Sequence, residues 1–195
     1  MVEPLPNEAE VVRESARGDG EAFGELVNHY QNAIFNLVVR MLGNREDARD
    51  VTQEVFLKAY RRLRSFKGRS RFATWLCSIA VNQSISERRK QSAASRRGGV
   101  PMSVLEGDDG RSYDPPGDTA GPDESLQAEE TMQQIEAAID ELSDDYRSVV
   151  VLRDIEGLDY RAISEALGCS RGTIKSRLHR ARLQLRRTLQ GLVAT

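Results

Sequence analysis

The chain has 195 residues, and its 28 Lys and Arg nearly balance its 30 Asp and Glu, which gives a formal net charge of −2 at pH 7. This length suits one or two small domains. The two cysteines, Cys77 and Cys169, have no companion Cys or His at metal-ligand spacing, so we expect no metal site and two buried thiols in a reducing compartment.

The N-terminal segment is acidic and lacks an apolar core, and no apolar run approaches about 20 residues. We therefore expect no signal peptide and no membrane insertion, and a soluble protein of the cytoplasm. The near-zero net charge hides the fact that basic and acidic residues gather in different stretches of the chain. Residues 58–71 carry seven Lys and Arg with no acid, residues 101–130 carry nine acids with one Arg, and residues 171–195 carry seven Lys and Arg with no acid. Such asymmetry indicates charged partners.

In chain order, residues 8–91 have dense helical periodicity and no proline. Apolar positions recur at helical spacing over 22–41, 48–63 and 75–85, with a break at Gly43 between the first two series. This pattern predicts a first domain built from long amphipathic helices.

Residues 92–125 are rich in Gly, Pro, Ser and Asp and have almost no large apolar residue after Leu105. Such a segment cannot bury enough surface to offset its ordering entropy, so we expect a flexible acidic linker. Residues 126–191 then form a second helical domain. The apolar run 149–152 follows an acidic cap and precedes a glycine, which favours helix over strand. The fold class that we expect is all-α, with two small helical domains.

Residues 160–187 predict a short helix, a tight turn and a longer basic helix. Asp159 can cap the first helix, Gly168 can end it, and Ser170 can cap the second helix. One apolar stripe follows both helices and consists of Ile163, Leu167, Ile174, Leu178, Ala181 and Leu185.

At roughly 100° per residue, the basic helix turns a set of polar side chains away from this stripe. The outward set, suited to base edges in the major groove of DNA, is Lys175, Ser176, His179 and Arg180. The flanking set, suited to phosphates, is Arg171, Arg177, Arg182, Arg186 and Arg187. The alternative is a solvated basic helix in a small helical domain. The coincidence of two caps, a glycine turn and a one-sided basic helix favours a DNA-binding helix-turn-helix.

Three motifs together resemble a bacterial RNA polymerase sigma factor of the sigma-70 family, in its extracytoplasmic function (ECF) group. They are DVTQEVFLKAY over 50–60, FATWLCSIAVN over 72–82 and GTIKSRLHRAR over 172–182. The resemblance covers nearly the whole chain. It implies that residues 8–91 bind core polymerase and melt and read the promoter −10 element, and that residues 126–191 read the −35 element.

For polymerase binding, the resemblance implies a role for Asp50, Gln53 and Glu54. Spacings of three and four place these side chains on one helix face, which can meet basic residues of a partner. The alternative is an ordinary solvated acidic face.

For the −10 element, residues 58–90 interleave Lys and Arg with aromatic rings, which suits phosphate neutralisation and base stacking on a single strand. The resemblance places Asn82 beside a flipped base, whose edges an amide can read. For Trp75, core packing and DNA contact remain equally open. The residues expected to contact −10 DNA are Phe66, Arg71, Trp75, Asn82, Arg88 and Arg89.

For the −35 element, the expected contacts are Arg171, Lys175, Ser176, His179, Arg180 and Arg182. The resemblance also implies an anti-sigma factor as a further partner. We expect no cofactor and no enzymatic activity, since the two histidines, His29 and His179, lie in different domains and no phosphate-binding glycine loop occurs. Two rival interpretations are a helix-turn-helix regulator that binds duplex DNA without polymerase, and an enzyme acting on nucleic acid.

Overall fold

A computed structural model describes residues 3–96 and 122–193, and every regular element in these two ranges is helical. The expected all-α fold is confirmed. The part of the predicted linker from 97 to 121 lies outside the described residues. Helix nevertheless continues into both ends of the predicted linker, through Arg96 on one side and from Pro122 on the other.

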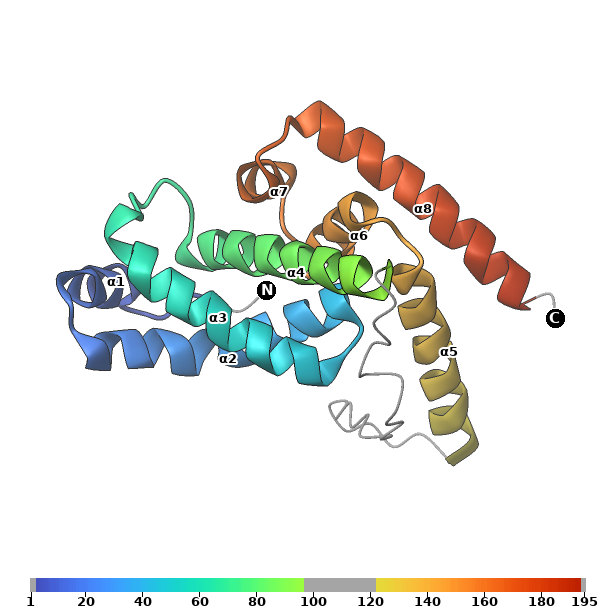
Figure 1. Ribbon diagram of the computed structural model, residues 1–195, viewed down its shortest axis with the longest axis horizontal. Coiled ribbons are helices and arrows are strands. Elements are labelled where there is room, and N and C mark those ends of the chain that lie inside the picture. The colour runs from blue at the N-terminus through green and yellow to red at the C-terminus, as the bar shows by residue number, and fades with distance from the viewer. Residues whose placement is uncertain (1–2, 97–121, 194–195) are drawn as a thin grey trace.

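The first group of helices is formed around α2, α3 and α4, which pack against one another, with α1 crossing one end (Figure 1). Their apolar faces interlock because each helix repeats apolar residues every three or four positions. The bounds of the elements are α1 (Glu8–Arg17), α2 (Gly20–Leu42), α3 (Arg45–Arg62), η1 (Leu63–Ser65) and α4 (Phe72–Arg96).

The predicted break between α2 and α3 is confirmed and has a local cause. Gly43 adopts a left-handed conformation with φ 75°, which costs little only for glycine. Asn44 then caps α3, because its Oδ1 accepts a hydrogen bond from the backbone N–H of Glu46 at 2.8 Å. Two long helices are thereby folded back against each other.

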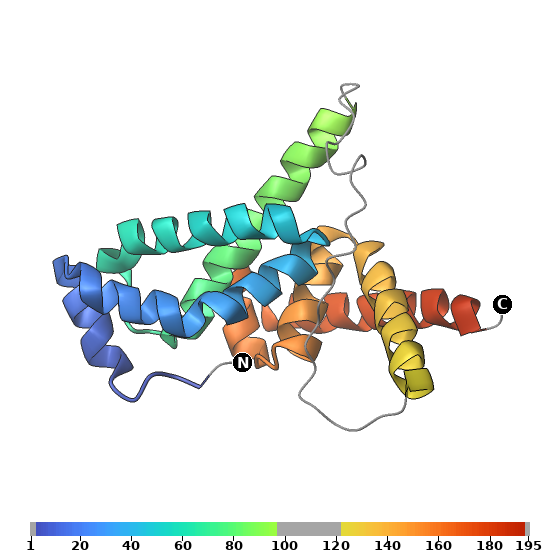
Figure 2. The same cartoon turned by 90° about the horizontal axis from the view of Figure 1, so that it is seen from below.

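The second group consists of α5 to α8. Helix α8 packs against α5, α6 and α7 and lies along the outer edge of the molecule (Figure 1). In the view from below, the C-terminal end of α4 projects beyond α2 and α3 (Figure 2). The bounds of the elements are α5 (Pro122–Asp140), α6 (Asp144–Val150), η3 (Val151–Ile155), α7 (Tyr160–Leu167) and α8 (Arg171–Val193).

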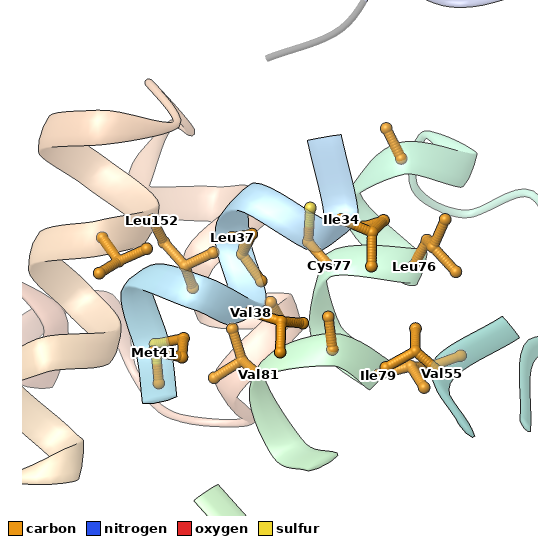
Figure 3. Close-up of a cluster of buried hydrophobic side chains, with 14 of the residues drawn as sticks. Ile34, Leu37, Val38, Met41, Val55, Leu76, Cys77, Ile79, Val81 and Leu152 are labelled. Atoms are coloured by element: carbon orange, nitrogen blue, oxygen red, sulfur yellow. The ribbon is translucent and has the colours of Figure 1, made fainter. Parts of the chain in front are cut away.

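The two groups contact each other through one continuous apolar cluster. Leu152 of η3 lies beside Leu37 and Met41 of α2, with Val81 of α4 close by (Figure 3). Helix α7 also packs on α4. Burial of these side chains from water is the main favourable contribution to this junction.

A polar cluster centred on a fully buried arginine completes the junction. Arg147 of α6 donates to the carbonyl of Met41 at 2.8 Å and pairs with the Asp140 carboxylate at 2.8 Å. Arg88 of α4 pairs with Asp144 at 2.8 Å and donates to the same Met41 carbonyl at 3.4 Å. Burial, followed by the neighbouring Arg88 charge, lowers the pKa of Arg147 to about 10.

The expectation that both cysteines are buried is wrong in part. Cys77 is buried as expected, but Cys169 in the turn before α8 is only half-buried. Met132 and Ile135, in α5 at the start of the second group of helices, are 44% and 37% exposed. Helix α5 contributes its apolar packing from its last turns, where Ala138 is buried.

Candidate nucleic-acid interface

The helix-turn-helix is formed by α7, a tight turn and α8. The Asp159 carboxylate accepts from the backbone N–H of Ala162 at 2.7 Å, and the Ser170 hydroxyl accepts from that of Thr173 at 3.1 Å. Gly168 between the helices has φ 63°. All three predicted signals, two caps and a left-handed glycine, are therefore present at their expected positions.

One face of α8 is buried and the opposite face is open. Ile174, Leu178 and Ala181 are at most 2% exposed, because they pack against α6 and α7. The four outward residues, Lys175, Ser176, His179 and Arg180, are all exposed, as are Arg171 and Arg182. The structure thus brings the whole predicted −35 set to the surface of one helix.

Besides Lys175, whose ammonium lies over the Tyr160 ring at 5.9 Å from its centroid, two members of this set already have hydrogen-bond partners within the second group of helices. The Arg182 guanidinium pairs with the Asp154 carboxylate, with one hydrogen bond of 3.1 Å from Nε, and this hydrogen bond raises the pKa of Arg182 above its ordinary value. The Ser176 hydroxyl donates to the carbonyl of Thr173 at 2.9 Å. Both pairs are solvent-exposed, so DNA phosphates or bases can exchange for them at small cost.

The predicted −10 residues lie around the start and one side of α4. The rings of Phe66 and Trp75 lie 5.1 Å apart between centroids and are tilted by 44° to each other, and both contact the buried ring of Phe72. Phe66 and Trp75 are half-buried, so each ring supports the core and keeps part of its surface open. For Trp75 the two alternatives left open by the sequence are therefore compatible.

Three polar residues of the −10 set are exposed, and two of them share a side of α4 with Trp75. Trp75, Asn82 and Arg89 are spaced by seven residues, which places them on one side of α4. Asn82 is exposed and donates from Nδ2 to the carbonyl of Ser78 at 2.8 Å. Arg71 and Arg89 are exposed as well.

Arg88 is the exception among the polar residues of the predicted −10 set. It is half-buried, and its ion pair with Asp144 belongs to the junction between the two groups of helices. The Arg88 guanidinium is thus already engaged within the chain, through Nε with Asp144 and through Nη1 with the Met41 carbonyl.

The predicted polymerase-binding residues Asp50, Gln53 and Glu54 are exposed on α3. Two large apolar side chains continue this surface toward the end of the helix. Leu57 is 56% exposed and Tyr60 is 43% exposed. Tyrosine is among the residue types enriched where a protein partner covers a surface.

Sequence reasoning missed two residues that organise these surfaces, Arg147 at the junction and Gln83 on α4. Both are buried polar side chains. In each case the available signal was a polar residue standing at an apolar position of a helical repeat, Arg147 beside the run 149–152 and Gln83 one turn after Ala80.

Within residues 3–96 and 122–193, no cluster of three or more His, Cys, Asp or Glu could hold a metal ion. A search of the same ranges for membrane-crossing helices found none that is both long and apolar enough.

Comparison with known proteins identifies the family. Residues 26–94 match the model for sigma-70 region 2, and residues 132–185 match the model for sigma-70 region 4. The chain is 36% identical over 196 residues to the ECF RNA polymerase sigma-E factor of Haemophilus influenzae, which covers 99% of this chain and 100% of that protein. It is 35% identical to the sigma-E factor of Escherichia coli K12, with 99% of each chain covered, and 35% identical to the RNA polymerase sigma-H factor of Pseudomonas aeruginosa, with 94% of each covered.

Two solved structures share the fold. The structure of CnrH in complex with the cytosolic domain of CnrY matches with a TM-score of 0.66 at 21% identity and covers 93% of this chain and 96% of that one. The Bartonella quintana sigma factor RpoE in complex with the anti-sigma factor NepR matches with a TM-score of 0.65 at 24% identity, and covers 86% and 96%.

The chain belongs to the sigma-70 family of RNA polymerase sigma factors, in the ECF group. Members of this family are DNA-binding transcription initiation factors, and this chain is a sigma factor that directs core RNA polymerase to promoters.

Proposed function

We propose that this sigma factor binds core RNA polymerase through the acidic face of α3, docks α8 on duplex −35 DNA and captures the opened −10 strand on α4. The observation that carries this assignment is the exposure of three chemically distinct surfaces on one chain. They are the acidic residues of α3, the aromatic and basic residues around α4, and the outward residues of α8.

On α8, Lys175 and Arg180 donate to base edges, and His179 and Ser176 complete the base-reading surface. Arg171 and Arg182 bind the flanking phosphates, which fixes the register of the helix on the duplex.

On α4 and the segment before it, Phe66 and Trp75 provide faces on which separated bases stack. The Asn82 amide reads one base edge, and Arg71 and Arg89 neutralise phosphates. Strand opening is driven by binding, so no side chain of the chain needs a catalytic role, and we propose none.

The packed arrangement of the two groups of helices has a consequence for this mechanism. The Arg88 guanidinium pairs with Asp144 in the packed state, so we propose that engagement of polymerase and promoter separates α6 from α4. The junction contributes stability to the packed state, and interactions with polymerase and DNA must exceed that contribution for the chain to open.

Two further assignments follow from the family. We propose that the protein acts in the cytoplasm, where its polymerase and promoters are found. We also propose that an anti-sigma factor binds it, supported by the two solved relatives of the same fold, one in complex with the cytosolic domain of CnrY and the other with the anti-sigma factor NepR.

The alternative of a helix-turn-helix regulator that acts without polymerase is not supported. The match to sigma-70 region 2 covers residues 26–94, which such a regulator does not need. Gel filtration of the purified chain with core polymerase tests the distinction. Our proposal predicts a stoichiometric complex, which is weakened by Asp50→Ala together with Gln53→Ala. Separate elution of wild-type chain and polymerase at micromolar concentrations would contradict it.

A further inference from the structure

Gln83 is a buried amide at the contact between α3 and α4. It is 5% exposed and follows Asn82, whose side chain is on the surface. A buried amide destabilises a protein unless its donor and acceptor are both satisfied. The partners of Gln83 are therefore informative about what the side chain does.

Both ends of the amide bind charged side chains of α3. Gln83 Nε2 donates to the carboxylate of Glu54, and Gln83 Oε1 accepts from the ammonium of Lys58. This orientation follows from the chemistry of the partners, because the reverse would place the amide oxygen against a carboxylate and the amide nitrogen against an ammonium.

The amide stands in the place of a pairing that the sequence otherwise favours. Glu54 and Lys58 are four residues apart with the acid first, which is the preferred arrangement for a helical ion pair. In the described structure the two side chains make no direct ion pair, and each binds Gln83. The Glu54 carboxylate is thus held in place by a neutral donor, so its negative charge remains available to a cationic partner.

We propose that Gln83 is a positioning residue for polymerase binding, which orients the Glu54 carboxylate on the acidic face of α3 and keeps it apart from Lys58. This inference rests on the proposed function, because it assumes that Glu54 contacts polymerase. It adds a residue of α4, the helix that carries Asn82, to the determinants of polymerase affinity.

The test compares two glutamines of α4 that have the same kind of partner. Gln91 also donates from its amide to a carboxylate of α3, that of Asp47, at 3.0 Å. Asp47 lies outside the predicted polymerase-binding set. Replacement of either glutamine by methionine removes an amide while keeping the length of the side chain, so Gln91→Met is the matched control.

The measured quantity is the dissociation constant between fluorescently labelled full-length chain and core polymerase. We expect Gln83→Met to weaken binding by roughly fivefold to tenfold, the size of one typical intramolecular hydrogen bond. Gln83→Glu, which places a second carboxylate beside Glu54, should weaken it further. Gln91→Met should bind within about twofold of wild type. A roughly fivefold loss of affinity in this control would show that losing either amide contact between α4 and α3 weakens binding, and it would overturn the inference.

A double-mutant cycle separates positioning from general destabilisation. In a Glu54→Gln background, Gln83→Met should cause no further loss of affinity, because its effect acts through the Glu54 charge. An equal loss in both backgrounds would overturn the inference. If Gln83→Met does not fold, Gln83→Asn keeps an amide that is one methylene too short to reach both partners, and it should also weaken binding.

The cycle also distinguishes failure of this inference from failure of the proposed function. If Glu54→Gln weakens binding and Gln83→Met leaves it unchanged, only the positioning role is refuted. If Glu54→Gln itself binds like wild type, the assignment of the α3 face to polymerase is refuted, and the role of Gln83 with it.

Discussion

Replacement of Arg147 by methionine tests the packed arrangement of the two groups of helices. The variant removes the guanidinium that donates to the carbonyls of Met41 and Asp140 and that pairs with the Asp140 carboxylate. Methionine fills much of the same space without a charge. The substitution therefore removes mainly electrostatic interactions, and it leaves the Met41 carbonyl and the Asp140 carboxylate without this partner.

The size of the loss follows from the exposure of these groups. The Asp140 side chain is 45% exposed, so water can solvate its carboxylate once Arg147 is gone. The Met41 carbonyl keeps only the hydrogen bond of 3.4 Å from Arg88. Truncation of one partner of a fully buried ion pair costs about 3–5 kcal/mol. Because one partner here is half exposed, we expect the free energy of unfolding to fall by about 2–3 kcal/mol.

Urea unfolding followed by circular dichroism measures this difference. The matched control is Arg161→Met, which removes a guanidinium that is 66% exposed and pairs with Glu165 within α7. An exposed pair of this kind contributes less than about 0.5 kcal/mol. If Arg147→Met unfolds at the same urea concentration as wild type or as the control, the two groups of helices are not held together by this arginine.

Three further predictions use other parts of the molecule. The double variant Lys175→Ala, Arg180→Ala should reduce discrimination between wild-type and mutated −35 elements by roughly tenfold or more in transcription assays. Asn82→Ala should reduce the permanganate reactivity of the opened −10 strand and leave −35 discrimination intact. Equal effects of the two variants on both readouts would refute the division of labour. Burial and a hydrogen bond to an acidic side chain raise the pKa of Tyr30 above its ordinary value, so the stability that it contributes is complete below about pH 10 and is lost as the pH rises further. Tyr30→Phe should flatten this alkaline decline in unfolding free energy, and an unchanged decline would contradict the assignment. Burial raises the pKa of Cys77 to about 12, so a thiol reagent at pH 8 should modify the other cysteine in the folded protein and both in urea, and rapid modification of both without urea would exclude this burial.

The parts of the structure that sequence predicted well are those with local causes. The turn of the helix-turn-helix depends on Asp159, Gly168 and Ser170, each of which acts on backbone within three residues of itself. The outward face of α8 follows from helical geometry alone. Such features are encoded in short stretches of chain and need no knowledge of the rest of the fold.

The junction between the two groups of helices could not be predicted in the same way. The role of Arg147 depends on the carbonyl of Met41, which is 106 positions away in the chain. Likewise, Gln83 is informative only once α3 and α4 are packed together. Helical periodicity identifies which side of a helix is buried, but it does not specify which distant element covers that side.

The central claim is that one chain brings two separate DNA-binding surfaces to the same promoter through core polymerase. In vitro transcription from a pool of randomised promoters, with purified core polymerase and this chain, tests it most directly. We expect transcripts only when the chain is present, and the selected templates should share two conserved blocks at the −35 and −10 positions. Transcription that is unaffected by the chain, or selection of a single block alone, would contradict the account.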